Sequence, residues 1–261
     1  MKISQYKGLT YLTSELFNKY GIKHIFTTIQ DENKVYPVDF SFANNKREEI
    51  LENYKKIAEY FNVPFKNIVK STQIHENNIV SVKSTHKGMG VASDEAFDNA
   101  DGIYTIEHNI PLCIFSADCV PILIADKEKK TVMAVHAGWR GTAKNITGKA
   151  IDIFLNEFKT KKEDIICAIG PAIGQCCFEV SEDVTEELAL LRDASDCFYI
   201  KDNKKHQLDL KKFNSFVIRD KGVPKENIDV CDLCTRCEEE LFHSFRRDGN
   251  KSGRNAAFIM L

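Results

Sequence analysis

Apolar residues recur at helical spacing in one stretch near the start of the chain. Over residues 48–61 they fall three and four positions apart, and the polar and proline-containing residues 62–64 then end the pattern. This spacing predicts a helix over 48–61. The apolar runs that follow are short and rich in β-branched residues, which is typical of strands. They predict extended segments over 66–75, 77–83 and 100–107.

The middle of the chain alternates apolar strands, glycine turns and helices. Residues 116–126, "SADCVPILIAD", end as a buried strand, and residues 131–138, "TVMAVHAG", form another. Residues 139–158 then carry apolar side chains on one helical face, and a second strand, glycine loop and helix follow over 164–191. The pattern over residues 241–261 predicts the end of a helix, a turn and a final strand. With neither the period of a barrel nor a G-x-G-x-x-G motif after a strand, the pattern predicts a mixed α and β fold.

Composition narrows the class of protein further. The 261 residues are 43% hydrophobic and contain no linker or repeat, so we expect one domain over 1–261. The 36 Lys and Arg residues nearly balance the 38 Asp and Glu residues, which argues against nucleic acid or membrane as a partner. No long apolar run or signal-peptide pattern is present, so we expect a cytoplasmic protein. Nine cysteines, an odd number, fit a reducing compartment with free thiols or metal ligands.

Three segments each place one good metal ligand where an apolar strand gives way to a turn. These residues are His75, Cys119 and His136. Any one of them alone is more often a packed histidine or a core thiol. If they converge, they form a three-ligand site with an open fourth position, which is typical of catalytic zinc. Asp118 would face this site only if the chain bends near Pro121, and it is otherwise a turn carboxylate that accepts backbone hydrogen bonds.

The segment "HAGWRGTAK" suggests a site for an anion. Gly138 and Gly141 let the chain turn tightly into a helix, whose first N–H groups favour negative charge. Arg140 and Lys144 would complete a phosphate site and Trp139 would offer a stacking surface. A solvated arginine and a core tryptophan are the alternatives.

Two further clusters carry chemically active side chains. Arg246, Arg247 and Arg254 surround a turn, either as donors to a phosphate or carboxylate or as ordinary solvated charges.

The run of residues 231–237, "CDLCTRC", has the C-x2-C-x2-C spacing of iron–sulfur proteins, but it lacks the fourth cysteine and the proline that usually follow. We expect its three cysteines to form a stripe along one helix.

Several motifs together resemble one known family, the multicopper polyphenol oxidase (laccase) domain family, whose members are regarded as zinc-dependent purine nucleoside enzymes. The resemblance begins near residue 24 and runs to the C-terminus, with the motifs in the expected order. The motifs are "QIHENNIV", "ADGIYT", "SADCVPILIAD", "VHAGWRGTAKNI", "IGPAIGQCCFEV" and "LFHSFRRDGNKSGRNAAFIML".

The resemblance implies one α+β domain of layered mixed β-sheets flanked by helices, an αββα-like arrangement. It implies one zinc ion bound by His75, Cys119 and His136, with Asp118 as a further catalytic residue. The implied reaction is phosphorolysis of adenosine, inosine, guanosine and S-methyl-5′-thioadenosine, with adenosine deamination as a side activity. Purine nucleosides and phosphate are therefore the expected partners of a monomer or homodimer. The residues expected to bind substrate or phosphate are Gln73, Arg140, Arg246 and Arg247.

The chain departs from the family pattern at several positions around the substrate. The residues "TTIQDENKVYPVDF" stand where a glycine-rich turn usually follows the first strand. Glu76 replaces a frequent glycine, Tyr54 a common arginine and Phe245 a frequent tyrosine. None of these changes touches the three expected ligands, so they bear on substrate preference rather than on the metal.

Three alternatives to a zinc phosphorylase stay open. Two histidines and one cysteine also match a blue-copper ligand set, but a laccase needs a further histidine-rich cluster, and this chain has seven histidines and no H-x-H pair. A cysteine hydrolase or amidase acting on cell-wall precursors would use Cys119 as its nucleophile and a histidine as its base. A domain that only binds nucleosides or a partner protein is the third.

Overall fold

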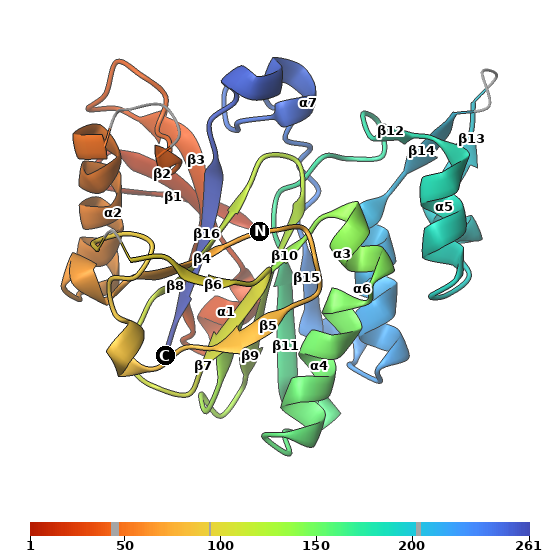
Figure 1. The fold of residues 1–261 in the computed structure, drawn as a ribbon, viewed down its shortest axis with the longest axis horizontal. Coiled ribbons are helices and arrows are strands. Elements are labelled where there is room, and N and C mark those ends of the chain that lie inside the picture. The colour runs from red at the N-terminus through yellow and green to blue at the C-terminus, as the bar shows by residue number, and fades with distance from the viewer. Residues whose placement is uncertain (43–46, 94, 202–204) are drawn as a thin grey trace.

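Two large β-sheets pack face to face in the computed structural model, and helices cover their outer faces (Figure 1). The structure describes residues 1–42, 47–93, 95–201 and 205–261. Within these ranges, the larger sheet has seven strands and the second has six. The first and the last strand of the chain both belong to the larger sheet.

The strands of the larger sheet, in spatial order, are β1 (Lys2–Tyr6), β2 (Leu9–Thr13), β3 (Lys23–Asp31), β16 (Asn255–Met260), β8 (Leu112–Ser116), β4 (Val69–Thr72) and β6 (Phe97–Asn99). Those of the second sheet are β15 (Ile228–Val230), β11 (Ile165–Ile169), β9 (Val120–Asp126), β10 (Val132–Ala137), β7 (Gly102–Thr105) and β5 (Ile79–Ser81). A small third sheet contains β12 (Glu179–Val180), β14 (His206–Leu208) and β13 (Phe198–Ile200).

The helices are mostly short. They are α1 (Glu15–Lys19), α2 (Arg47–Phe61), α3 (Trp139–Ala143), α4 (Ile146–Asn156), α5 (Glu182–Ala189), α6 (Leu210–Asp220) and α7 (Phe245–Asp248). No helix in the described ranges is long and apolar enough to cross a membrane.

Burial of strand β9 on both faces explains its apolar run from Val120 to Ala125. Ile122 and Ile124 pack on one side in a cluster that includes α4 and α6. Leu123 and Ala125 point to the other side, into the layer between the two large sheets. Because successive side chains of a strand point to opposite faces, a strand covered on both faces needs an unbroken apolar run.

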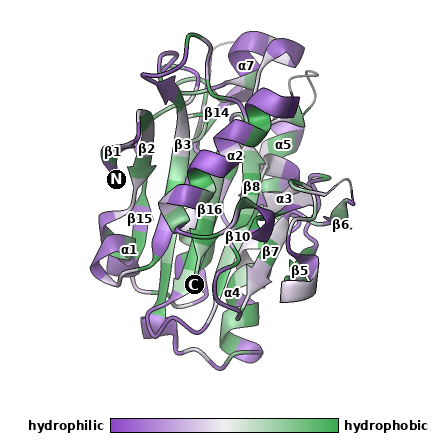
Figure 2. Cartoon of the chain, turned by 90° about the vertical axis from the view of Figure 1, so that its left-hand side faces the viewer, coloured by the Kyte–Doolittle hydropathy of each residue, from purple (hydrophilic) through white to green (hydrophobic). Residues whose placement is uncertain are grey.

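The larger sheet is covered on its outer face by α2. Tyr54, Ile57 and Phe61 of this helix pack against Ile25 and Phe258 of the sheet. Figure 2 shows hydrophobic colour on the central strands and hydrophilic colour on the outward side of α2. With α4 and α6 on the opposite side, the layers run helix, sheet, sheet, helix, which confirms the predicted α+β class.

The predicted helices agree with the structure in one place and differ in another. Helix α2 matches the predicted range 48–61 and begins one residue earlier. The single helix predicted over 139–158 is divided into α3 and α4. The division falls at Asn145, which has a φ of 62° and therefore lies in the left-handed region, where a right-handed helix cannot continue.

Candidate active site

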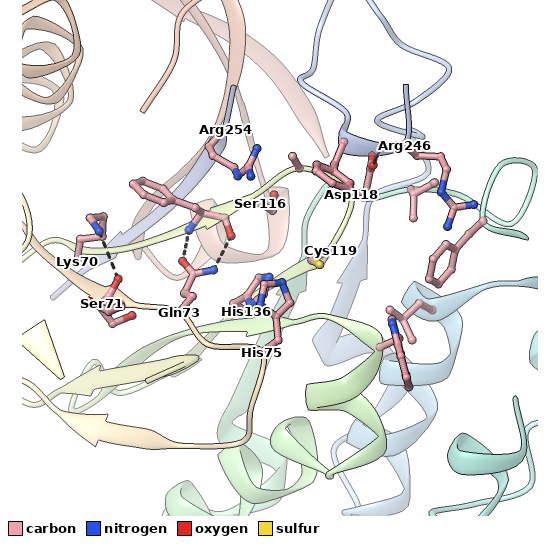
Figure 3. A pocket seen from close by; sticks show the side chains of 18 residues that line it. Lys70, Ser71, Gln73, His75, Ser116, Asp118, Cys119, His136, Arg246 and Arg254 are labelled. Atoms are coloured by element: carbon pink, nitrogen blue, oxygen red, sulfur yellow. Dashed lines mark hydrogen bonds between the residues drawn. The ribbon is translucent and has the colours of Figure 1, made fainter. Parts of the chain in front are cut away.

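Three separate segments bring His75, Cys119 and His136 together at one edge of the sheets. His136 lies near the end of β10, and Cys119 directly precedes β9, the antiparallel neighbour of β10. His75 lies in the loop after β4 and has a φ of 60°. One ligand atom from each residue lies within 4.8 Å of the others. Figure 3 shows the two imidazoles and the thiol converging on one point.

A buried carboxylate, Asp101, holds two of these ligands in place. Its side chain is inaccessible to solvent and accepts a hydrogen bond from Nδ1 of His136 at 2.8 Å. It also accepts the backbone N–H groups of Ile74, His75 and Glu76, at 3.2, 3.0 and 2.8 Å. Burial opposes ionisation of Asp101, but the bonds from His136 and from the N–H groups of Glu76 and Ile74 lower its pKa. With Nδ1 occupied, His136 has only Nε2 left for a metal.

Cys119 and His136 each favour the charged form of the other. Burial opposes both charges, yet the neighbouring His136 lowers the pKa of the Cys119 thiol to about 6, with a smaller contribution from His75. Burial likewise opposes a charged His136, while Cys119 and Asp101 raise its pKa to about 9. The site therefore favours a thiolate, which is the form of cysteine that binds metals and attacks electrophiles.

The space around the three ligands fits a metal ion. A Cβ atom on Gly138 would lie 3.1 Å from Sγ of Cys119 and 3.4 Å from the ring of His75. Glycine at this position therefore keeps a side chain out of the space that the ligands face. Two imidazoles, a thiolate and a carboxylate behind one imidazole match the ligands and outer partners of a zinc site.

Asp118 lies beside Cys119 where the chain bends sharply, with a φ of 90°. Asp118 is among the residues that line the cavity described below. Its carboxylate is nearly buried and accepts two bonds of 2.6 Å, from the hydroxyl of Thr235 and from the backbone N–H of Arg246. These contacts are those of a carboxylate that organises neighbouring turns.

The three ligands open onto a cavity of about 530 Å³. Small-molecule sites commonly have volumes of about 300–1,000 Å³. The aromatic side chains of Phe115, Trp139, Phe178 and Phe245 contribute to its walls. Its size and mixed polar and apolar lining suit a ligand that has an aromatic ring and polar substituents.

The predicted substrate-binding residues do not all reach this cavity. Gln73 and Arg246 line it. The amide of Gln73 accepts from the backbone N–H of Phe115 at 2.6 Å and donates to its carbonyl at 2.9 Å, so it fixes the strand that forms one wall (Figure 3). Arg140 is absent from the lining; it is exposed and its guanidinium lies 4.3 Å from the centre of the Trp139 ring.

Arg247 is also outside the lining, because its side chain is used within the protein. It donates to the carbonyls of Thr235 and Phe242, at 3.2 and 2.8 Å, and forms an ion pair with Asp248. These bonds tie α7 to the preceding loop. Neither Arg247 nor Arg140 lines the cavity.

Two further cations line the cavity: Lys70, to which the sequence did not point, and Arg254, which the sequence placed at one turn with Arg246 and Arg247. Lys70 and Arg254 lie on one side of the ligands in Figure 3, and Arg246 lies on the other. Burial lowers the pKa of Lys70. None of the three is paired with a carboxylate in the part of the chain that the structure describes. Each of the three side chains donates to a backbone carbonyl, and the cavity offers an anion positive charge that no carboxylate of the described residues neutralises.

Comparison with known proteins identifies the family. The family described as multi-copper polyphenol oxidoreductase laccase matches residues 35–261. The chain belongs to this laccase-like family. The purine nucleoside phosphorylase YlmD of Bacillus subtilis is 35% identical over 219 residues, covering 83% of this chain and 79% of the relative. Its namesake in Geobacillus stearothermophilus is 36% identical over 221 residues, covering 83% and 80%.

Solved structures agree with the sequence comparisons. The hypothetical protein YfiH of Bacillus licheniformis has a TM-score of 0.91 at 30% identity, covering 99% of this chain and 98% of that one. YlmD from Geobacillus stearothermophilus has a TM-score of 0.90 at 31% identity, covering 98% and 97%. The laccase-like fold thus extends over nearly the whole chain.

Within this laccase-like domain, sequence reasoning missed Asp101. The only signal was an aspartate at the start of a predicted strand, in "ADGIYT". Its role depends on contacts with residues 74–76 and His136, which no local pattern reveals.

The prediction that the three cysteines of residues 231–237 form a stripe along one helix is wrong. Residues 231–237 form no helix but a loop after β15. Cys231 is buried in the core, while Cys234 and Cys237 lie near two cysteines from another loop. The loop forms because Cys234 makes a bridge to Ala172 beside β11.

Proposed function

We propose that this protein is a zinc-dependent purine nucleoside phosphorylase. The observation that supports this most strongly is the cavity, in which a metal-binding triad, aromatic walls and three cations without carboxylate partners occur together. Relatives at 35 and 36% identity bear the name purine nucleoside phosphorylase. The proposed substrates are phosphate with adenosine, inosine, guanosine or S-methyl-5′-thioadenosine.

The cations of the cavity suit the phosphate that such a reaction requires. Lys70 and Arg254 line it together with the polar residues Ser116 and Gln73, and charge-assisted hydrogen bonds are the strong means of holding a phosphate. We infer that they, with Arg246, replace Arg140 and Arg247 as the phosphate-binding residues. His75, Cys119 and His136 would hold the zinc ion, which would supply Lewis-acid chemistry at the cavity.

The bond changes in phosphorolysis explain why fixed charge helps. A phosphate oxygen forms a bond to C1′ of the ribose, the bond from C1′ to the purine nitrogen breaks, and the purine leaves with the electron pair and gains a proton. Positive charge develops on the sugar between these events. A phosphate held beside it by Lys70 and Arg254 stabilises that charge, since the residues need no rearrangement during the reaction.

Product analysis tests the proposal. Zinc-loaded protein is incubated with inosine, with and without phosphate, and the products are separated by chromatography. Free base and ribose 1-phosphate should form only with phosphate.

Steady-state kinetics test the proposed phosphate site. Lys70→Ala should raise the KM for phosphate by roughly tenfold or more, since one charged hydrogen bond is lost. Arg140→Ala, which removes a cation outside the cavity, is the matched control and should leave that KM unchanged.

Adenosine deamination stays a prediction of the same site. Adenosine incubated without phosphate should yield inosine if this activity is present, and the same chromatography detects it. Absence of inosine would remove the deaminase activity from the proposal. Absence of any turnover of inosine with phosphate would refute the phosphorylase itself.

A cysteine hydrolase is a second candidate because one observation favours it. Without metal, Cys119 has a lowered pKa and His136 a raised one, which is the charge distribution of a thiolate nucleophile with its imidazolium partner. Iodoacetamide and a chelator distinguish the two. A metal-free activity that alkylation abolishes would favour the hydrolase, and an activity lost with the chelator and restored by zinc would favour the phosphorylase. Strong blue absorption with bound copper would instead indicate an oxidase.

A further inference from the structure

Four cysteines from two distant loops meet outside the cavity. Cys176 and Cys177 follow β11, and Cys234 and Cys237 follow β15. These strands pair in parallel, so their carboxyl ends lie at the same edge of the sheet. The pairing extends into the loops through the parallel bridge between Ala172 and Cys234. All four sulfur atoms lie within 4.8 Å of one another.

The spacing of the sulfur atoms suits a shared metal ion. Sγ of Cys237 lies 3.4 Å from that of Cys177 and 3.6 Å from that of Cys176. A disulfide would need about 2.05 Å, and all four cysteines are free. With zinc–sulfur bonds of about 2.3 Å, tetrahedral geometry separates the sulfurs by about 3.8 Å. The observed arrangement is therefore close to that of four thiolates around one ion.

Two of the four sulfur atoms accept hydrogen bonds from N–H groups of the same two loops. The backbone N–H of Gly174 donates to Sγ of Cys234 at 3.1 Å, and the guanidinium of Arg236 donates to Sγ of Cys177 at 3.4 Å. Hydrogen bonds to ligating atoms of this kind orient them for metal binding.

Glycine at position 174 also leaves room for the sulfurs. A Cβ atom there would lie 3.1 Å from Cβ of Cys234 and 3.2 Å from Sγ of Cys176. Such contacts are tighter than ordinary van der Waals distances, so a larger residue would push the two loops apart. The loop is thus shaped for close approach of the two cysteine pairs.

We propose that Cys176, Cys177, Cys234 and Cys237 bind a structural zinc ion. With four protein ligands the site is closed, unlike the open three-ligand site of Cys119. The short distances between the sulfurs favour a single ion over an iron–sulfur cluster, in which several irons and sulfides separate the thiolates.

This zinc ion would fasten one wall of the cavity. Ile173 and Phe178, on the loop that carries the first cysteine pair, line the cavity. Thr235, between the cysteines of the second pair, donates to Asp118 next to Cys119. Joining the two loops therefore stabilises the position of this wall without placing the metal at the reaction centre.

Metal analysis of the full-length protein, purified under reducing conditions, tests the site. Cys119→Ala removes the three-ligand site, so any zinc that remains reports on the four cysteines. We expect this variant to retain about one zinc ion per chain, and Cys176→Ser with Cys237→Ser added to it should lose that ion. Cys231→Ala is the matched control, because Cys231 belongs to the same run of sequence but points into the core. It should leave the zinc content unchanged.

Cobalt provides a second readout. In the Cys119→Ala background, cobalt(II) should give the intense thiolate-to-metal charge-transfer absorption of tetrahedral thiolate coordination, and substitution of Cys176 and Cys237 should abolish it. Circular dichroism confirms that the variants are folded. A folded, fully reduced Cys119→Ala protein that binds neither zinc nor cobalt would overturn the proposal. Bound iron in place of zinc, or a disulfide among the four cysteines in freshly purified protein, would overturn it as well.

Discussion

Two buried histidines, His24 in β3 and His136 in β10, occupy environments that burial alone does not distinguish. Their exposed fractions are 1% and 3%. Burial lowers the pKa of His24 to about 4, whereas Cys119 and Asp101 raise that of His136 to about 9 in the metal-free protein. What separates a candidate active-site histidine from a core histidine here is the charge of its neighbours.

The hydrogen bonds of His24 explain why it stays neutral. Its Nε2 accepts the backbone N–H of Ser14 at 2.7 Å, and its Nδ1 lies 2.8 Å from the carbonyl of Ile22. These partners assign the neutral form with its proton on Nδ1. A second proton on Nε2 would face the Ser14 N–H directly. His24 therefore serves the larger sheet, and His136 serves the cavity.

The largest expected effect is the difference in activity between the His136→Gln and His24→Gln variants. His136→Gln removes a proposed metal ligand, so phosphorolysis should fall by well over about 100-fold, beyond the usual cost of losing an outer partner. His24→Gln keeps one donor and one acceptor in the core and should change kcat/KM only slightly. Steady-state kinetics of both variants, with zinc content measured in parallel, checks this. Similar losses in the two variants would remove the distinction between them.

The second prediction concerns stability against pH. The folded-state pKa of His24 lies below its unfolded value of about 6.5, so the unfolded chain binds the proton first as pH falls. Stability should be fully present above about pH 6.5 and should decline by about 3 kcal/mol towards pH 4 from this group. Urea unfolding at a series of pH values measures it. The wild type should lose more stability than His24→Gln across this window; parallel curves would contradict the assignment.

A smaller effect should follow from removing the negative charge of Asp101, which accepts a hydrogen bond from Nδ1 of His136. Asp101→Asn keeps the size of the side chain but removes its negative charge. Zinc affinity at the three-ligand site should fall by about 10- to 100-fold, as is typical for partners of metal-bound histidines. Competition with a chromophoric chelator measures this. Asp126→Asn is a matched control, since Asp126 is also buried but bonds to Thr160 away from the site. Equal affinities in both variants would show that Asp101 does not support the site.

Much of the fold was predictable because local patterns report burial directly. The helix over 48–61 and the strands around 120–126 and 132–137 were evident from apolar spacing. The break at Asn145 was not, since asparagine is common both in helices and at turns. The N-terminal strands and α6 were not singled out from their sequence, and they are recognised as part of the layers only through their packing.

By itself, the sequence determined which residues have the chemistry of ligands and which strands are covered on both faces. It pointed to His75, Cys119 and His136 because each lies where an apolar run meets a turn. Only the tertiary structure decided that Asp101 supports two of them, that Lys70 and Arg254 line the cavity, and that four cysteines meet. The reason is that these contacts join segments far apart in the chain. Such neighbours arise from strand pairing and loop packing, which leave no periodic signal in the residues themselves.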